Sequence, residues 1–316
     1  MTLIELYQAE LLEAIGSKQV VVMGENINNG SRLSGLGKNL ETLPRAKVIN
    51  IGNCELTHIG TGMGMMMQGK NLILMVKQLD FLLLGLDQMV NTLNWIKAQD
   101  SDNQLGSFTI LTYICNQGFQ GPQSSLVDLT SLSVAGAFPS YILQEKTQTA
   151  RILNEHLLEP GFRIIAIPQK IAKLKITEEK PVFFNKQHGL TLYGKSKEVL
   201  IVSCHSSFSY AIEFKNYLTS KGKMSSIALL DCIPGSNFTV AFPFIDCPKH
   251  CLVIDDAKSP LRWGDFAYRR LHESFPNTKL SFASRKEPFV YSVNSDDFGL
   301  NNEDLYKITF KNAQDF

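Results

Sequence analysis

The sequence predicts an α/β protein with two domains, in residues 1–180 and 190–316. Three observations support this class. Short apolar, β-branched runs alternate with helical patterns along the chain, as in mostly parallel sheets covered by helices on both faces. The chain has 316 residues, which is enough for two domains of ordinary size. Its composition, 44% hydrophobic and 19% charged, is that of a globular protein.

The elements of the first domain follow from periodicity and from turn residues. Leu3, Leu6, Leu11 and Ile15 recur at helical spacing, which predicts a helix over residues 3–16. Apolar runs bounded by turn residues predict strands at 19–23, 47–51, 71–76, 108–114, 140–143 and 164–167. Helical patterns lie between them, at 57–69, 80–98 and 147–158.

The second domain repeats this alternation on a smaller scale. Residues 171–197 break the rhythm with lysine-rich turns and a short hairpin-like piece, and we interpret them as the connection between the domains. Strands are then predicted at 198–204, 226–230 and 251–255, with helices at 209–221 and 264–275. A smaller α/β domain is therefore expected after the connection.

Charge and composition exclude several classes of function. The 31 basic and 30 acidic residues leave a net charge of +1, with no basic excess for a nucleic-acid partner. Every long apolar stretch contains charges or glycines, so no membrane span is expected. The first residues lack the basic region and cleavage site of a secretory signal, and six scattered cysteines without a CxxC pair suit free thiols. We therefore expect a cytoplasmic location.

The most informative segment is Asn53 to Gly60, which contains Glu55 and His58. Glu55 comes shortly after the strand predicted at 47–51, at the edge where open α/β sheets bind ligands. A buried carboxylate is costly in free energy, so it needs a partner or a task. His58 lies three residues later and shares a helical face with Glu55. Spacing alone leaves a helix-capping glutamate and an interior histidine as alternatives.

A second block begins at Asp80-Phe81 and continues through 86–91, Leu-Asp-Gln-Met-Val-Asn. Aromatic rings stack well on flat heterocycles, although a phenylalanine before an apolar helix also suits the core. The later loop from Asn116 to Ser125 is rich in glutamine and glycine and follows a strand. Such a loop is suited to substrate contacts, with an ordinary solvated loop as the alternative.

Together these blocks resemble the β subunits of thiamine-diphosphate-dependent 2-oxoacid dehydrogenases and the wider transketolase C-terminal region. Cys54-Glu55 with Gly60 resembles the family's S-E-x-G-x-x-G block, and residues 80–91 resemble its D-[FY]-x-x-P-x-[LF]-D-Q-[IV]-x-N helix. Residues 21–26 resemble its opening G-E-D strand, and Gly121-Pro122-Gln123 its G-x-Q-H-S-Q loop. The resemblance implies a pyrimidine-binding domain followed by a transketolase C-terminal-like domain.

The resemblance also implies roles for individual residues. Glu55 is implied as the catalytic acid that meets the aminopyrimidine of thiamine diphosphate, a role that suits a partly buried glutamate of raised pKa. Phe81 is implied to stack on the pyrimidine, and Asp80 and Gln123 to contact the cofactor. Gln123 and Ser124 are expected to contact the substrate. His58 is a second catalytic candidate.

This sequence departs from the family at four places: Ser124, Gly235-Ser236, residues 255–258 with Trp263-Gly264, and the potassium loop. Ser124 replaces the family histidine, which favours decarboxylation with acyl or ketol transfer on a 2-oxoacid or ketose over lipoamide acylation. A non-catalytic or regulatory paralogue that keeps the fold and subunit interface is the alternative. The family's potassium loop is matched at 106–109, whereas its acidic and asparagine ligands have no clear match near 159–161, so a potassium site stays open.

The missing parts of the site predict a partner. The chain lacks the G-D-G motif with a following asparagine that holds Mg²⁺ and the diphosphate in this superfamily. A diphosphate needs a metal, so we expect a separate α-like subunit to hold Mg²⁺ and predict no metal ligand in this chain. The expected assembly is an α₂β₂ heterotetramer. A lipoyl acyltransferase is an open further partner.

Overall fold

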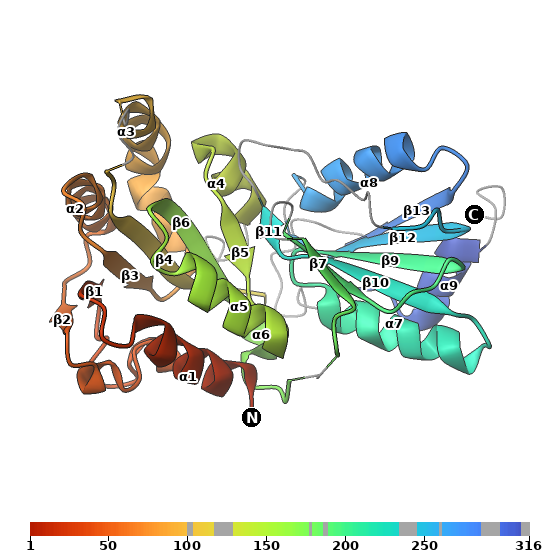
Figure 1. The fold of residues 1–316 in the computed structure, drawn as a ribbon, viewed down its shortest axis with the longest axis horizontal. Coiled ribbons are helices and arrows are strands. Elements are labelled where there is room, and N and C mark those ends of the chain that lie inside the picture. Colours follow the sequence, from red (N-terminus) through yellow and green to blue (C-terminus); the bar gives the residue numbers. More distant parts are fainter. Residues whose placement is uncertain are drawn as a thin grey trace.

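The computed structural model describes residues 1–99, 104–116, 129–176, 179–185, 189–233, 245–258, 261–285 and 298–310. Two sheets lie side by side in it (Figure 1). The first has the strand order β11-β5-β6-β4-β3-β1-β2, and all its pairs are parallel except β11 with β5. Its strands are β1 (Val20–Gly24), β2 (Ala46–Asn50), β3 (Leu72–Val76), β4 (Ser107–Ile114), β5 (Ser140–Ile142), β6 (Gly161–Pro168) and β11 (Cys232–Ile233).

Helices cover both faces of the first sheet, and they explain why its central strands are apolar throughout. One face carries α1 (Leu3–Ile15) and α5 (Lys146–His156), with the short α6 (Gln169–Ala172). The other face carries α2 (Glu55–Met67), α3 (Leu93–Gln99) and α4 (Leu129–Gly136). Two short 3₁₀ turns, η1 (Leu33–Gly35) and η2 (Leu40–Thr42), lie between β1 and β2.

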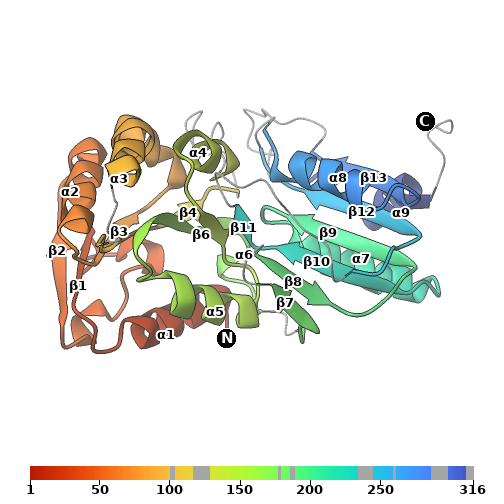
Figure 2. The same cartoon turned by 45° about the horizontal axis from the view of Figure 1, so that its top comes forward.

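The second sheet has the order β13-β12-β9-β10-β8-β7, with four parallel strands and an antiparallel edge. Helices α7 (Phe208–Ser220) and α9 (Asn302–Phe310) cover one face and α8 (Trp263–Ser274) the other (Figure 2). Its strands are β7 (Phe183–Asn185), β8 (Leu190–Tyr193), β9 (Val199–Cys204), β10 (Ser225–Leu230), β12 (His250–Asp255) and β13 (Lys279–Ser284).

A strand from the second half of the chain joins the first sheet, and one cluster of buried apolar residues contacts both sheets. After β10 in the second sheet, the chain crosses directly to β11, which pairs with β5 at the edge of the first. One continuous cluster of buried apolar residues extends from the α2 face of the first sheet to the α8 face of the second. The two sheets are therefore packed against each other.

The predicted α/β class with mostly parallel sheets is confirmed, and one predicted helix is wrong. Residues 80–98 form a 3₁₀ segment η3 (Leu79–Gly85), a π-helical turn η4 (Gln88–Thr92) and then α3. Gly85 ends the 3₁₀ segment, and a Cβ there would lie 2.2 Å from Cδ1 of Ile59 in α2. The close packing of α2 thus requires glycine in a segment whose helix it weakens.

Other elements did not emerge from periodicity. Strands β11 and β13 and helices α4 and α9 were not predicted. The hairpin-like piece in 171–197 is β7–β8, which extends the second sheet rather than standing alone. Within the part of the chain that the structure describes, none of the helices has the length and apolar character needed to cross a bilayer.

Candidate functional site

The strand order of the first sheet reverses at β1. The chain passes from β1 to β2 on one side and then crosses to β3 on the other, so β1 and β3 flank a topological switch point. In open α/β sheets such points create crevices outside the carboxyl ends of the strands, where ligands bind. Glu25 follows β1 and Lys77 follows β3 at this edge.

One small pocket at this edge brings together three of the predicted site residues. Glu55, His58 and Phe81 all line it, over a floor formed by residues 74–76 of β3. Glu25 and Lys77 complete its polar rim. Its cavity volume is about 20 Å³, which is room for about one water molecule. A flat heterocycle would therefore have to lie across its mouth rather than inside it.

The start of α2 positions Glu55 and His58. Glu55 is the first residue of the helix and is partly buried, and the backbone N–H of His58 donates to the carbonyl of Cys54 at 3.0 Å. The positive end of the helix dipole favours a carboxylate at that position. Burial lowers the pKa of His58, and the nearby charge of Glu55 opposes this shift. His58 is therefore neutral at pH 7.

A second carboxylate faces the same pocket. The side-chain amide of Asn53, in the orientation that satisfies both groups, donates to Glu25 Oε2 at 2.6 Å. Glu25 and Glu55 thus both line the pocket, with Asn53 holding Glu25 in place. Such a rim accepts hydrogen bonds from a ligand that carries N–H groups.

The other predicted site residues do not join this pocket. Asp80 is 5% exposed within η3 and is not among the residues that line it. Burial, with a contribution from Asp80, raises the pKa of the Cys115 thiol to about 12, so Asp80 lies toward the end of β4. Gln123 and Ser124 fall outside the described residues.

A larger cavity with basic residues adjoins this pocket. It measures about 290 Å³ and is lined by Lys77, Lys170 and Lys173, with Gln78, Cys115 and Gln169. Lys77 lines both spaces, so they share a wall. The ammonium group of Lys170 donates to the Tyr210 hydroxyl at 2.8 Å, which fixes one of the positive charges. The cavity suits an anionic ligand.

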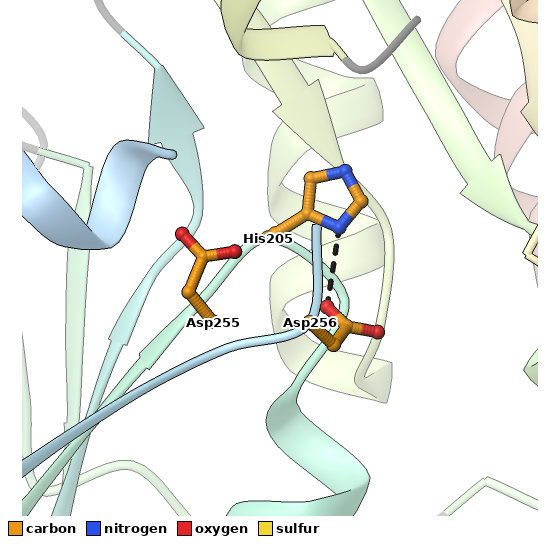
Figure 3. A group of neighbouring side chains, drawn as sticks. All are labelled: His205, Asp255 and Asp256. Carbon is orange, nitrogen blue, oxygen red and sulfur yellow. Dashed lines mark hydrogen bonds and ion pairs between the residues drawn. The ribbon is translucent and has the colours of Figure 1, made fainter. Parts of the chain in front are cut away.

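The second sheet has its own switch point, between β9 and β12, and a buried polar cluster occupies it (Figure 3). His205 Nδ1 lies 3.1 Å from Asp256 Oδ1, and Ser206 Oγ donates to Asp256 Oδ2 at 2.5 Å. His205, Asp255 and Asp256 are each at most 3% exposed. Sequence analysis missed this cluster, although two acidic residues directly after an apolar run mark the end of β12.

The chemistry of this cluster is structural. A Ser-His-Asp triad uses different ring nitrogens for serine and aspartate, whereas here Ser206 and Asp256 both face Nδ1 of His205. The three candidate metal-ligand atoms lie within 4.8 Å of one another. The Asp255 oxygens, however, accept from the N–H groups of Ala257 and Gly264, at 2.9 and 2.7 Å. Each oxygen of this carboxylate thus has a hydrogen-bond donor within the chain.

The two neighbouring carboxyl groups have opposite pKa shifts. Burial raises the pKa of Asp255 to about 6. Burial acts in the same direction on Asp256, but the hydrogen bond and charge of His205 outweigh it and lower the pKa below its ordinary value. Gln144 Nε2 donates to the carbonyl of His205 at 2.7 Å, and Asn116 Nδ2 donates to Ser206 Oγ at 3.2 Å. The cluster thus fastens the second sheet to the first.

Comparisons with solved structures agree with this architecture. One match is a "Split gene transketolase, inactive beta4 tetramer", with a TM-score of 0.69 and 15% identity over 95% of this chain and 94% of that chain. Another is the transketolase of Campylobacter jejuni subsp. jejuni, with a TM-score of 0.71 and 12% identity over 97% of this chain. The fold is transketolase-like.

The resemblance seen in the motifs is therefore confirmed at the level of the fold. The transketolase-like chain spans 46% of the Campylobacter enzyme and nearly all of the split-gene subunit. No protein-family model matches the sequence, and no curated protein does. Identities of 12 to 15% establish the fold and leave the activity to be argued from the site.

Proposed function

We propose that this chain is the β-type subunit of a two-subunit thiamine-diphosphate-dependent enzyme. It acts on a 2-oxoacid or a ketose, by decarboxylation or carbon–carbon cleavage with acyl or ketol transfer. The observation that carries the proposal is the pocket that Glu55, His58 and Phe81 share at the strand reversal of a transketolase-like fold. Phe81 lies at least 23 positions after Glu55 and His58 in the sequence, so the fold brings two separate segments together at this pocket.

The residues of the pocket fit the ring end of this cofactor. An aminopyrimidine has N–H groups on one edge and a flat apolar face. The carboxylates of Glu25 and Glu55 supply acceptors for the edge, and Phe81 with the floor of β3 supplies apolar contact for the face. The shallow pocket leaves the other face of the ring open, so a second polypeptide has to cover it.

Each side chain then has a defined task. Glu55 would hold a proton between its carboxyl oxygen and ring nitrogen N1′, and Phe81 would orient the ring. Neutral His58 would accept a proton on the substrate side of Glu55 and return it once protonated. When bound, thiamine diphosphate supplies the nucleophilic carbon that attacks a carbonyl group. Asp80, behind Phe81, would support the position of η3, and Gln123 and Ser124 remain proposed contacts with cofactor and substrate.

The outer face of helix α2 is suited to close contact with a partner subunit. A Cβ added at Gly60 would lie 4.0 Å from Gln88 Cγ, its one neighbour among the described residues. A Cβ added at Gly64 would have no described atom within 4 Å. A glycine within a helix costs about 1 kcal/mol relative to alanine, and no contact with the described residues requires glycine at these two positions. The side-chain oxygen of Gln88, beside Gly60, is buried without a hydrogen-bond partner among the described residues. Close approach of another chain would account for both features.

Apolar side chains surround this helix. Those most exposed on α2 and on the adjoining segment from η3 to α3 are Leu56, Met67, Leu83, Leu84, Leu86 and Trp95. Exposed apolar side chains that gather in this way mark an interaction surface. We propose that the α-like subunit binds here and brings the Mg²⁺ and diphosphate ligands, in an assembly of two α-like and two β-like chains.

The basic cavity indicates the charge of the substrate. Lys77 lines both it and the pocket of Glu55, so a substrate bound beside the cofactor ring would extend toward Lys170 and Lys173. Three ammonium groups favour a carboxylate or phosphate end. An anionic 2-oxoacid or ketose is therefore the preferred substrate class, and neutral analogues should bind more weakly.

Replacement of Glu55 in the reconstituted two-subunit complex tests the proposal. Glu55→Gln keeps the shape of the side chain but removes the acid, so kcat should fall about 10²–10⁴-fold. The matched control is Glu13→Gln, an exposed glutamate on α1, which should leave kcat unchanged. Unchanged turnover in Glu55→Gln would reject the assigned role.

Cofactor titration separates the enzyme from the non-catalytic paralogue. Thiamine diphosphate with Mg²⁺ is titrated calorimetrically into the complex of the two subunits. Binding at micromolar cofactor concentrations is expected for the enzyme. A complex that assembles but shows no heat of binding would favour a scaffold, which keeps the fold and the interface without the chemistry.

A further inference from the structure

Arg163 is a buried cation that the proposed reaction does not use. It lies in β6, is 2% exposed and is among the largest fully buried side chains of the described residues. Burial lowers the pKa of its guanidinium to about 10, so the group still carries its charge at neutral pH. A buried charge is costly in free energy unless polar groups surround it.

Two of the three guanidinium nitrogens donate to oxygen atoms near the start of β4 and β6, and Nε is buried without an acceptor among the described residues. Arg163 Nη1 donates to Thr109 Oγ1 at 3.2 Å, and Nη2 donates to the carbonyl of Pro160 at 2.7 Å. The Thr109 hydroxyl donates in turn to the carbonyl of Leu157 at 2.6 Å. Arg163 therefore links Thr109, near the start of β4, to Pro160 in the segment that leads into β6.

This place coincides with the incomplete potassium loop of the sequence. Of residues 106–109, which match the beginning of that loop, 107–109 begin β4, and residues 159–161 run into the first position of β6. The two segments lie together, since Ser107 pairs with Gly161 and the Gly161 N–H donates to the Gly106 carbonyl at 2.8 Å. Residues 159–161, where the family's acidic and asparagine potassium ligands have no clear match, therefore lie beside the Arg163 guanidinium.

A guanidinium and a monovalent cation can serve the same oxygen atoms. Carbonyl and hydroxyl oxygens are the ligands of hard cations, and they are also the acceptors that a guanidinium fork satisfies. Two cations at this place would repel each other strongly in the low dielectric of the interior. The Glu159 carboxylate also opposes the pKa shift of Arg163, which shows a favourable interaction with its charge.

We propose that Arg163 takes the place of a bound monovalent cation. Its guanidinium holds the start of β4 against the segment before β6, so this chain folds and keeps its stability without potassium. The inference concerns stability only, and it stands or fails independently of the proposed reaction.

The first test compares the thermal unfolding of the wild-type chain in potassium chloride and in choline chloride of equal ionic strength. The melting temperature should be the same in both salts, because the charge is part of the chain. A cation at 100 times its dissociation constant would raise the melting temperature by roughly 5 °C. A saturable, potassium-specific rise of that size would overturn the proposal.

The second test separates charge from packing at this position. Arg163→Met removes the charge and the donors, and it should lower the melting temperature by about 5 °C or more. Arg163→Lys keeps a charge and should recover part of that loss. Arg45→Met, at an exposed arginine before β2, is the matched control and should have no effect.

Two results at this position would contradict the proposal. One is a lysine variant no more stable than the methionine variant, because the charge would then contribute nothing. The other is a methionine variant as stable as wild type. If Arg163→Met fails to fold at all, the comparison of wild type in the two salts decides.

Discussion

At the scale of single residues, environment rather than residue type decides how a carboxyl group behaves. Asp255 and Asp256 are adjacent and both buried, yet their pKa values move in opposite directions. Among the described residues, Asp255 accepts from the backbone N–H groups of Ala257 and Gly264, whereas Asp256 also bonds the side chains of His205 and Ser206.

Asp255 gives a pH prediction. Its folded pKa of about 6 lies above the ordinary value of 3.8, so the folded state binds this proton more tightly. The stabilisation is complete below pH 3.8 and is lost as the pH rises toward 6, by about 3 kcal/mol at most. Asp255→Asn does not titrate, so the stability difference between wild type and variant should shrink as the pH rises.

Urea unfolding at several pH values between 4 and 7 measures this difference. Ser281→Ala, on neighbouring β13, is a control without a titrating side chain, and its curve should run parallel to that of wild type. Parallel curves for Asp255→Asn as well would mean that Asp255 keeps an ordinary pKa in the folded protein.

At the scale of elements, helix α2 shows that identical residues serve different purposes on its two faces. Gly62 faces the sheet, where a Cβ would lie 2.3 Å from the ring of Phe108, whereas Gly64 faces outward with nothing within 4 Å. The first glycine permits packing within the chain. Glycine at position 64 has a packing role only if another chain lies close to this face of the helix.

The two glycines therefore predict opposite outcomes. Gly62→Ala should destabilise the isolated chain by about 1–3 kcal/mol through overpacking. Gly64→Ala should stabilise the isolated chain by up to about 1 kcal/mol, because alanine favours the helix. Chemical denaturation of the two variants, side by side, measures both effects. Loss of stability in Gly64→Ala would show that this position is packed within the chain.

A larger side chain at the outer position tests the partner surface. Gly64→Leu should keep the fold and the melting temperature of the isolated chain but reduce binding to the α-like subunit at least tenfold. Size-exclusion chromatography and calorimetry of the mixed subunits measure the binding. Binding of the leucine variant with unchanged affinity would place the subunit interface elsewhere.

At the scale of the whole molecule, Arg151 joins the two sheets. From α5 of the first half it reaches Asp231 at 2.5 Å and Thr191 at 3.3 Å. Its guanidinium also lies 3.5 Å from the ring centre of Phe184 in β7. The Asp231 carboxylate is 2% exposed, so it depends on this partner. Together with β11, these contacts couple the unfolding of the two halves.

Loss of Arg151 should therefore weaken the whole chain. Arg151→Met leaves the carboxylate of Asp231 buried without its counter-charge, which should cost about 3–5 kcal/mol of unfolding free energy. Arg269→Met, on the exposed side of α8, is the matched control and should change little. Far- and near-ultraviolet circular dichroism should show one shared transition in wild type. An unchanged stability in Arg151→Met would disprove the coupling.

Much of the candidate site was predictable because its residues lie at strand ends. Glu55, His58 and Phe81 follow β2 and β3 in sequence, and parallel strands bring their carboxyl ends to one edge. Asp80 was expected beside them, but it is buried in the 3₁₀ segment η3 and does not line this pocket. Local spacing could not reveal that segment, because its packing against Ile59 of α2 is a contact at larger sequence separation.

The sequence by itself determined the alternation of strands and helices, because local hydrophobic periodicity produces buried strands and amphipathic helices. Only the tertiary structure decided which distant groups meet. The return of β11 to the first sheet, the pairing of His205 with Asp256 and the seating of Arg163 against Thr109 depend on contacts at large sequence separation. Such contacts arise from the packing of the completed sheets, and no local pattern encodes them.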